Sequence, residues 1–133
     1  MIAGIKERLN DMKESGEMYL ETVYVLSKSI DCVRAVDVAK ELGVSKPSVS
    51  RALKILKDGG FLIVDPNGGI SLSDIGSEYA VKIYERHTLL TELFVSFGVD
   101  EKTASEDACR IEHVISDISV MKIKNVLGKN KSA

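Results

Sequence analysis

The twenty residues Asp37–Leu56, DVAKELGVSKPSVSRALKIL, determine the course of the backbone more firmly than any other stretch of this 133-residue chain. Ala39 is small enough for two helices to cross closely. Gly43, four residues later, can adopt the left-handed conformation that ends a helix. Ser45 is a good N-cap for the next helix, and Pro47 is tolerated in the first turn of that helix. The segment is therefore predicted to form two short helices joined by a tight turn.

The spacing within this segment is that of a helix-turn-helix, with Val49 as a buried position of the second helix six residues after Gly43. That helix should end at the glycine pair 59–60. The apolar run 61–64 and the alternating run 70–73 then read as two strands, and the sequence DPNGG at 65–69 is strong turn chemistry between them. A hairpin directly after the second helix is typical of the winged variant.

The rest of the chain is predicted to be helical. Asp74 can cap the long helix that follows the hairpin, and Gly98 ends it. Apolar residues recur at helical spacing over 14–28, 36–42, 75–97, 100–115 and 118–127. We therefore expect a mainly α protein, with an N-terminal winged helix-turn-helix and a two-stranded wing over residues 1–73, and an α-helical domain over residues 74–133.

Composition excludes several classes of protein. Apolar residues make up 44% of the chain and charged residues 29%, which is typical of a folded globular domain. No apolar stretch approaches the roughly 20 residues that cross a bilayer, so we expect no membrane span. Met1–Ser15 is mixed in charge and lacks the apolar core of a secretory signal. Two cysteines are too few for a disulfide scaffold, so a cytoplasmic location is expected.

The net charge of −2 hides a basic middle segment. Residues 28–60 hold seven basic and four acidic side chains, net +3, and the segments on either side are net acidic. In a helix-turn-helix the second helix enters the major groove. Its apolar stripe leaves Ser48, Ser50, Arg51 and Lys54 on other faces, where they suit base edges and phosphates. The alternative is a solvated basic helix in a winged fold that contacts proteins.

A second group of residues is not needed by a DNA-binding domain. Met18 and Glu21 are three apart on the first predicted helix, and Cys109 is followed by Glu112 and His113 at helical spacing. His87, the one other histidine, lies between these segments. Thioether, thiolate, imidazole and carboxylate groups together suit a first-row divalent metal ion. Each residue taken singly also fits an ordinary core or surface position.

Four stretches resemble the diphtheria toxin repressor family of metal-dependent transcription regulators, which includes the manganese transport regulator. They are GEMYLETVY at 16–24, the residues around 45–50, Arg86-His87, and DACRIEHV at 107–114. The resemblance covers about Glu14 to Leu127. It implies that the helical domain binds metal and dimerises. It also implies that the homodimer binds a palindromic operator upstream of metal-uptake genes when the metal is plentiful.

The resemblance also assigns roles to individual residues. Met18, Cys109, Glu112 and His113 match the activating metal site of the iron-type members. Glu21 and His87 match ligand positions of the manganese type. In the DNA groove the family uses the positions of Ser45, Pro47, Ser48, Ser50 and Arg51. With the neighbouring lysines, the predicted DNA-binding residues are Ser45, Lys46, Pro47, Ser48, Ser50, Arg51 and Lys54.

Three departures from the family pattern bear on the metal. The chain has the length of the manganese branch, without the SH3-like domain of longer members, yet that branch has carboxylates where Met18 and Cys109 stand. Thr91 and Ser105 occupy ancillary-site positions that hold ligands in iron-type members. A methionine and a cysteine shift the preference toward Fe(II), with Mn(II) second and Zn, Co or Ni as surrogates.

Other functions remain open from the sequence. One is a metal-independent winged-helix regulator that responds to another ligand or to a protein partner. A small metal-dependent hydrolase using the two histidines and Glu112 is disfavoured, because no nucleophile elbow or phosphate loop accompanies them. We therefore expect no enzyme. A winged-helix scaffold is the third alternative, and it predicts no salt-dependent binding to duplex DNA.

Overall fold

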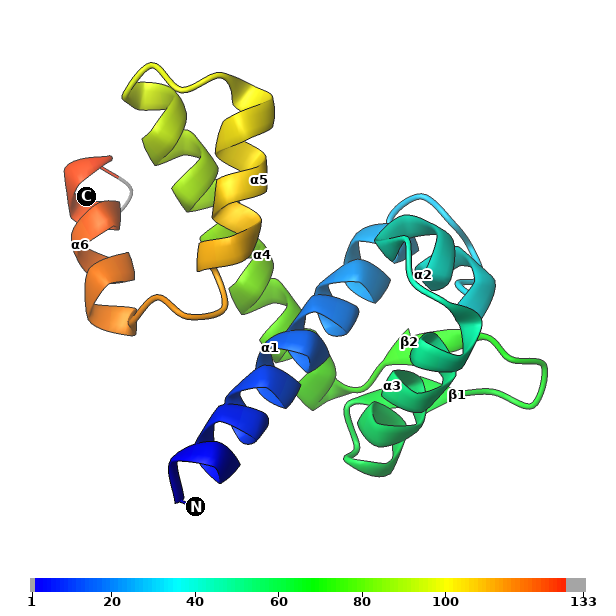
Figure 1. The fold of residues 1–133 in the computed structure, drawn as a ribbon. Coiled ribbons are helices and arrows are strands. Elements are labelled where there is room, and N and C mark those ends of the chain that lie inside the picture. Colours follow the sequence, from blue (N-terminus) through cyan, green and yellow to red (C-terminus); the bar gives the residue numbers. More distant parts are fainter. Residues whose placement is uncertain (1, 129–133) are drawn as a thin grey trace. The chain divides into compact units, whose positions relative to one another are not determined.

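The computed structural model describes the backbone of residues 2–128 and the side chains of residues 15–128. The chain is helical apart from one two-stranded sheet, and its contacts divide it into two compact units, residues 1–81 and 82–133 (Figure 1). This confirms the mainly α fold with a winged N-terminal region. No helix among the described residues combines the length and the apolar character that a membrane crossing requires.

The N-terminal unit is a winged helix-turn-helix. Its elements are α1 (Ile2–Ser27), α2 (Ala35–Leu42), α3 (Lys46–Asp58), β1 (Leu62–Val64), β2 (Ile70–Leu72) and the first turns of α4 (Asp74–Ser96). α1 contacts α2, α3 and β2, and α2 contacts α3. The core is aliphatic, with Val23, Val38 and Val49 at most 1% exposed. This burial is what holds three short elements against α1.

The turn between α2 and α3 forms as the sequence predicts. Gly43 has φ +66°, the left-handed region, and its N–H donates to the carbonyl of Ala39. The Ser45 hydroxyl accepts the N–H of Ser48 at 3.3 Å and so caps α3. α3 ends at Asp58, directly before the glycine pair. Local capping and helix-ending residues therefore fix this motif.

The wing is a short antiparallel hairpin. β1 pairs with β2 in the register Leu62↔Leu72 and Val64↔Ile70. At the tip, the Asp65 carboxylate accepts the backbone N–H groups of Asn67 and Gly69, both at 2.8 Å. The aspartate thus closes the turn from inside.

The C-terminal unit consists of the rest of α4, α5 (Glu101–Ile111) and α6 (Asp117–Val126). Asp100 caps α5 by accepting the N–H of Thr103 at 3.0 Å, and this hydrogen bond lowers the pKa of its carboxyl group. Ser116 caps α6 in the same way, accepting the N–H of Ser119 at 3.2 Å. α4 and α5 bury Ile83, Leu90, Ala104 and Ala108.

Three boundaries differ from the sequence prediction. α1 begins at Ile2 and not at about residue 14, because mixed charge without apolar periodicity still permits a helix. Ser73, and not Asp74, caps α4, since its hydroxyl accepts the N–H of Gly76 at 3.1 Å. α5 ends at Ile111, three or four residues earlier than expected. Glu112 and His113 therefore lie in the turn after α5, a change that matters for the site.

Candidate metal centre and nucleic-acid interface

Glu112 is the centre of the most unusual cluster in the C-terminal unit. Glu112 is 0% exposed, and its side chain is among the largest that are fully buried in the described part of the chain. Glutamate is rarely buried without a compensating partner, because an ionised carboxylate loses its hydration there. The turn after α5 begins with Glu112, whose N–H still donates to the carbonyl of Ala108. The end of α5 therefore carries this carboxylate into the interior.

Two histidines flank the Glu112 carboxylate, one on each oxygen. Nδ1 of His87, from α4, lies 2.8 Å from Oε2. Nε2 of His113 lies 3.3 Å from Oε1, and the His113 side chain is 3% exposed. The chain's two histidines, 26 positions apart in the sequence, thus meet at one carboxylate.

The second ring nitrogen of His87 also has a partner. Nε2 of His87 lies 3.2 Å from the hydroxyl of Ser105 on α5. The Thr91 hydroxyl, one turn further along α4, donates to the His87 carbonyl at 2.7 Å. Of these two hydroxyl groups, that of Ser105 contacts the His87 imidazole, whereas that of Thr91 contacts the His87 backbone. Contacts at both ring nitrogens fix the orientation of its ring.

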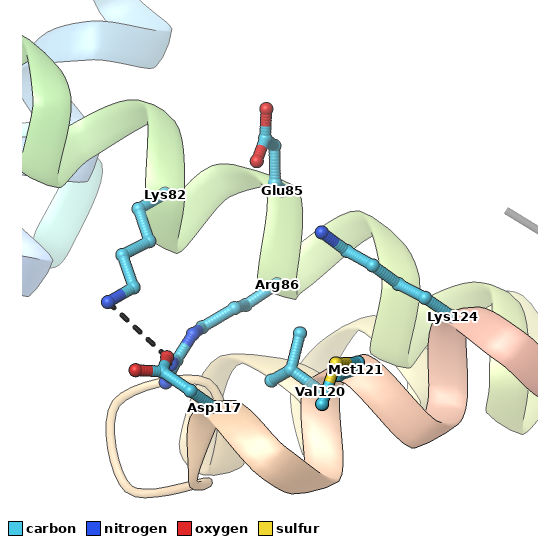
Figure 2. A pocket seen from close by; sticks show the side chains of 7 residues that line it. All are labelled: Lys82, Glu85, Arg86, Asp117, Val120, Met121 and Lys124. Carbon is cyan, nitrogen blue, oxygen red and sulfur yellow. Dashed lines mark hydrogen bonds and ion pairs between the residues drawn. The ribbon is translucent and has the colours of Figure 1, made fainter. Parts of the chain in front are cut away.

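Arg86, next to His87, holds the turn that carries Glu112. Its guanidinium donates to the carbonyl of Ile115 at 2.7 Å and to that of Glu112 at 3.3 Å. It also pairs with Asp117 at the start of α6 (Figure 2). Arg86 is only 8% exposed, so its guanidinium lies mostly away from solvent, whereas the Asp117 side chain is largely exposed. Carbonyls left over at the end of α5 are thereby satisfied by a charged donor, which ends the helix and directs the chain into α6.

Asp117 is shared between two cations. Lys82 Nζ lies 3.3 Å from its Oδ1, as the dashed line in Figure 2 shows. The hydrogen bond and charge of Lys82, followed by the charge of Arg86, lower the pKa of this carboxyl group. A cavity of about 320 Å³ lies here, lined by these three side chains, by Glu85 of α4, and by Val120, Met121 and Lys124 of α6 (Figure 2).

The remaining predicted ligands lie on α5 and α1. Cys109 is a half-buried cysteine on α5 that forms no disulfide, three residues before Glu112. Met18 and Glu21 are half-buried neighbours on α1 in the N-terminal unit. The hydroxyl of Thr22 donates to the Met18 carbonyl at 2.8 Å. Within the C-terminal unit the structure thus brings His87, Glu112 and His113 together, and Cys109 is carried by the same helix end.

This donor set fits a divalent metal ion. A buried carboxylate between two imidazoles, with a thiol one turn away in sequence, combines the ligand types that first-row divalent ions prefer. Ser105 orients the His87 imidazole, and Arg86 holds the backbone of Glu112. Metal ligands in proteins are commonly oriented by hydrogen bonds of this kind. The cluster is therefore a candidate metal centre on the C-terminal unit alone, before Met18 and Glu21 are considered.

The candidate DNA-binding face lies on α3. Six of the seven predicted residues are exposed, and the seventh, Ser48, is half-buried. Ser48 and Ser45 also share a hydrogen bond between their hydroxyls at 2.9 Å, so both take part in the cap. Val49, Leu53 and Leu56 form the opposite, buried stripe of the same helix. Arg51 and Lys54 are therefore exposed on the face of α3 opposite its buried stripe.

Sequence reasoning did not identify the contacts that two arginines make with distant parts of the chain. The residues around Arg86 in the sequence do not indicate that it holds the turn after α5, because its partners lie 26 to 31 residues further along the chain. Arg34 entered only as part of the basic middle segment. Its position three residues before Asp37 was a usable signal, since the Asp37 carboxylate accepts the Arg34 N–H at 2.9 Å in a helix cap.

Two family models match the chain, and together they cover nearly all of it. Residues 11–70 match the model described as the N-terminal DNA-binding domain of iron-dependent repressors. Residues 73–133 match the model for the metal-binding and dimerisation domain of the same repressors. The first match contains the helix-turn-helix and most of the wing, and the second contains the Glu112 cluster.

Individual proteins agree with the family models. An uncharacterised HTH-type transcriptional regulator of Methanocaldococcus jannaschii is 36% identical over 122 residues, covering 90% of this chain and 98% of that protein. MntR of Listeria welshimeri is 33% identical, with 85% and 80% covered. The diphtheria toxin repressor of Corynebacterium glutamicum is 28% identical over 90% of this chain. The chain spans 53% of that repressor's length.

A solved structure shows the same fold. A manganese-dependent transcriptional repressor in complex with manganese superposes with a TM-score of 0.78 at 27% identity, over 85% of this chain and 52% of that one. The fold, the two domain matches and the relatives agree on one assignment. The chain belongs to the iron-dependent repressor family of DNA-binding, metal-dependent transcription regulators.

Proposed function

We propose that this chain acts in the cytoplasm as a homodimeric repressor of metal-ion uptake genes, activated by Fe(II) or, second, by Mn(II). The observation that carries the proposal is the fully buried Glu112 carboxylate between His87 and His113. In the proposed site these three residues and Cys109 bind the ion, and Met18 and Glu21 are further ligands from α1. Zn, Co and Ni are expected to act as surrogates.

The residues of the two units explain how metal and DNA binding can be linked. Because the proposed ligands come from both units, their use of a common ion restricts the conformations available to the winged unit. Two winged units that must reach half-sites about 34–36 Å apart then need less ordering when they dock. On the DNA side, Arg51 and Lys54 approach base edges or phosphates, and the hydroxyls of Ser48 and Ser50 allow close approach.

The proposal is tested with a DNA duplex that the protein selects from a pool of random sequences. Anaerobic fluorescence anisotropy compares DNA binding without metal and with Fe(II), Mn(II) or Zn(II). We expect Fe(II) and Mn(II) to tighten binding by about 5- to 150-fold, the usual range of coupling between sites. Glu112→Gln keeps the shape but removes the charge, so it should abolish this gain.

Glu106→Gln is the matched control, because Glu106 is an exposed glutamate on α5, the helix that leads into Glu112. It should retain the full response to metal. Equilibrium dialysis supplies the second measurement. If the wild-type protein binds no divalent ion at micromolar free metal, the metal-independent regulator is the better description.

A further inference from the structure

The wing depends on support from outside its own two strands. β1 and β2 have three residues each, and an isolated hairpin of this size is marginally stable in water. The segment that leads into α2 provides the support. Val33 forms a bridge to Ile70, whose N–H donates to the Val33 carbonyl at 2.8 Å. The end of β2 next to the turn is therefore attached to the residue just before Arg34.

Arg34 extends this attachment to the tip of the wing. Its guanidinium donates to the carbonyl of Asn67, which is 33 residues away in sequence. Gly68, beside it, has φ +86°, and a Cβ built there would lie 3.4 Å from the same guanidinium. The side chain thus lies directly against the turn of the wing. Arg34 is also the N-cap residue of α2, held by the Asp37 carboxylate.

These contacts form a continuous path from the wing tip through α2 to α3. The tip is closed by Asp65, the tip carbonyl is bound by Arg34, Arg34 begins α2, and α2 contacts α3. In the described part of the chain, Arg34 has no carboxylate within ion-pair distance of its guanidinium. The hydrogen bond of the guanidinium therefore holds the wing tip and does not neutralise a carboxylate.

We propose that Arg34 is a positioning residue for DNA binding, which fixes the wing tip relative to α3 so that both reach the duplex as one rigid surface. The inference rests on the DNA-binding face proposed above. A wing held in advance loses less conformational freedom on docking than a wing that must be ordered by DNA. The rival role, a direct contact of Arg34 with a phosphate, gives different results in the experiment below.

The experiment has one readout without DNA and one with DNA. In the free protein, hydrogen exchange is measured at the amides of Gly68, Gly69 and Ile70. Arg34→Ala should speed their exchange by about 3- to 10-fold, the loss of one hydrogen bond. DNA affinity for the selected duplex should fall by a similar factor. The slope of log affinity against log salt should stay unchanged, because no phosphate contact is removed.

Arg34→Lys separates positioning from charge. Lysine keeps the positive charge, but its chain is one bond shorter and lacks the guanidinium fork, so it should behave as the alanine variant does. Lys40→Ala, an exposed lysine on α2, is the charge-matched control and should leave wing exchange unchanged. The proposal fails if wing exchange is the same in Arg34→Ala and wild type. It also fails if the salt slope falls by about 0.9 and lysine restores binding, which indicates a phosphate contact.

The two readouts keep this proposal separate from the proposed function. Hydrogen exchange is measured without metal or DNA, so it tests the wing attachment even if the response to Fe(II) or Mn(II) is absent. Conversely, a normal metal response with unchanged wing exchange in Arg34→Ala overturns the role of Arg34 alone.

Discussion

At the scale of single residues, the site is governed by how one carboxylate is surrounded. Glu112 is buried, yet its two carboxylate oxygens contact the imidazoles of His87 and His113. Ser105 holds the far nitrogen of His87, where a ligand would be needed for an ancillary ion. A hydroxyl at this position is a weak ligand for a divalent ion compared with an imidazole. We therefore expect the activating site to operate without the ancillary one.

Cys109 should set the choice of metal. Cys109→Asp replaces a soft thiolate with a hard oxygen donor, so Mn(II) should gain on Fe(II) by on the order of tenfold in the concentration that gives half-maximal DNA binding. Anaerobic anisotropy titrations with each ion measure this ratio. Cys32→Ser, which removes the exposed thiol of the N-terminal unit, should leave the ratio unchanged. An unaltered metal ranking in Cys109→Asp contradicts this account of selectivity.

At the scale of elements, the start of α4 depends on a close approach of two backbones. A Cβ placed on Gly76 would lie 2.0 Å from the carbonyl oxygen of Phe61, far inside any permitted contact. The Phe61 ring in turn meets the Tyr79 ring edge-on, with centroids 5.5 Å apart. Ser73 caps the helix at the same place and also donates to the Gly60 carbonyl at 2.6 Å. The exit from the wing and the entry into α4 are thus one packed junction.

This junction predicts an unusual sign for Gly76→Ala. Alanine normally stabilises a helix relative to glycine by about 1 kcal/mol. Here the contact with Phe61 forces the backbone apart, so we expect a net loss of about 1–3 kcal/mol in the free energy of unfolding. Urea denaturation followed by circular dichroism measures it. Glu78→Ala, at an exposed position of the same helix, should cost little, and a stabilised Gly76→Ala variant shows that the junction yields easily.

At the scale of the whole molecule, DNA binding and metal binding are coupled equilibria. The winged unit carries the DNA-binding face, whereas the Glu112 cluster belongs to the C-terminal unit. Coupling between such sites is reciprocal, because each ligand must favour the state that the other favours by the same free energy. If metal raises the affinity for DNA, then DNA must raise the affinity for metal by the same factor.

The reciprocity gives a measurable equality. Titration with Mn(II), with and without saturating duplex, should show metal affinity rising on DNA by the same factor by which Mn(II) raises DNA affinity. We expect that factor to lie at about 5–150-fold. In Glu112→Gln both factors should approach one together. A metal affinity that is identical on and off DNA excludes the linkage.

The elements of this protein were predictable because their signals are local. Gly43, Ser45 and the glycine pair after α3 fix helix ends through the conformations and hydrogen bonds of neighbouring residues. The hairpin follows from the turn residues at 65–69 in the same way. The types of the candidate metal donors were also predictable, because the two histidines, the nearby carboxylate and the thiol can be read directly from the sequence.

The amino-acid sequence alone thus determined the helix order, the wing and the chemistry of the candidate donor atoms. Only the tertiary structure decided which groups meet. It ends α5 before Glu112, buries that carboxylate against His87, and brings Arg86 and Arg34 to carbonyls 26 to 33 residues away. The physical reason is that caps and periodicity act within one or two helical turns. A buried charge, by contrast, finds its partners through the folding of the whole chain.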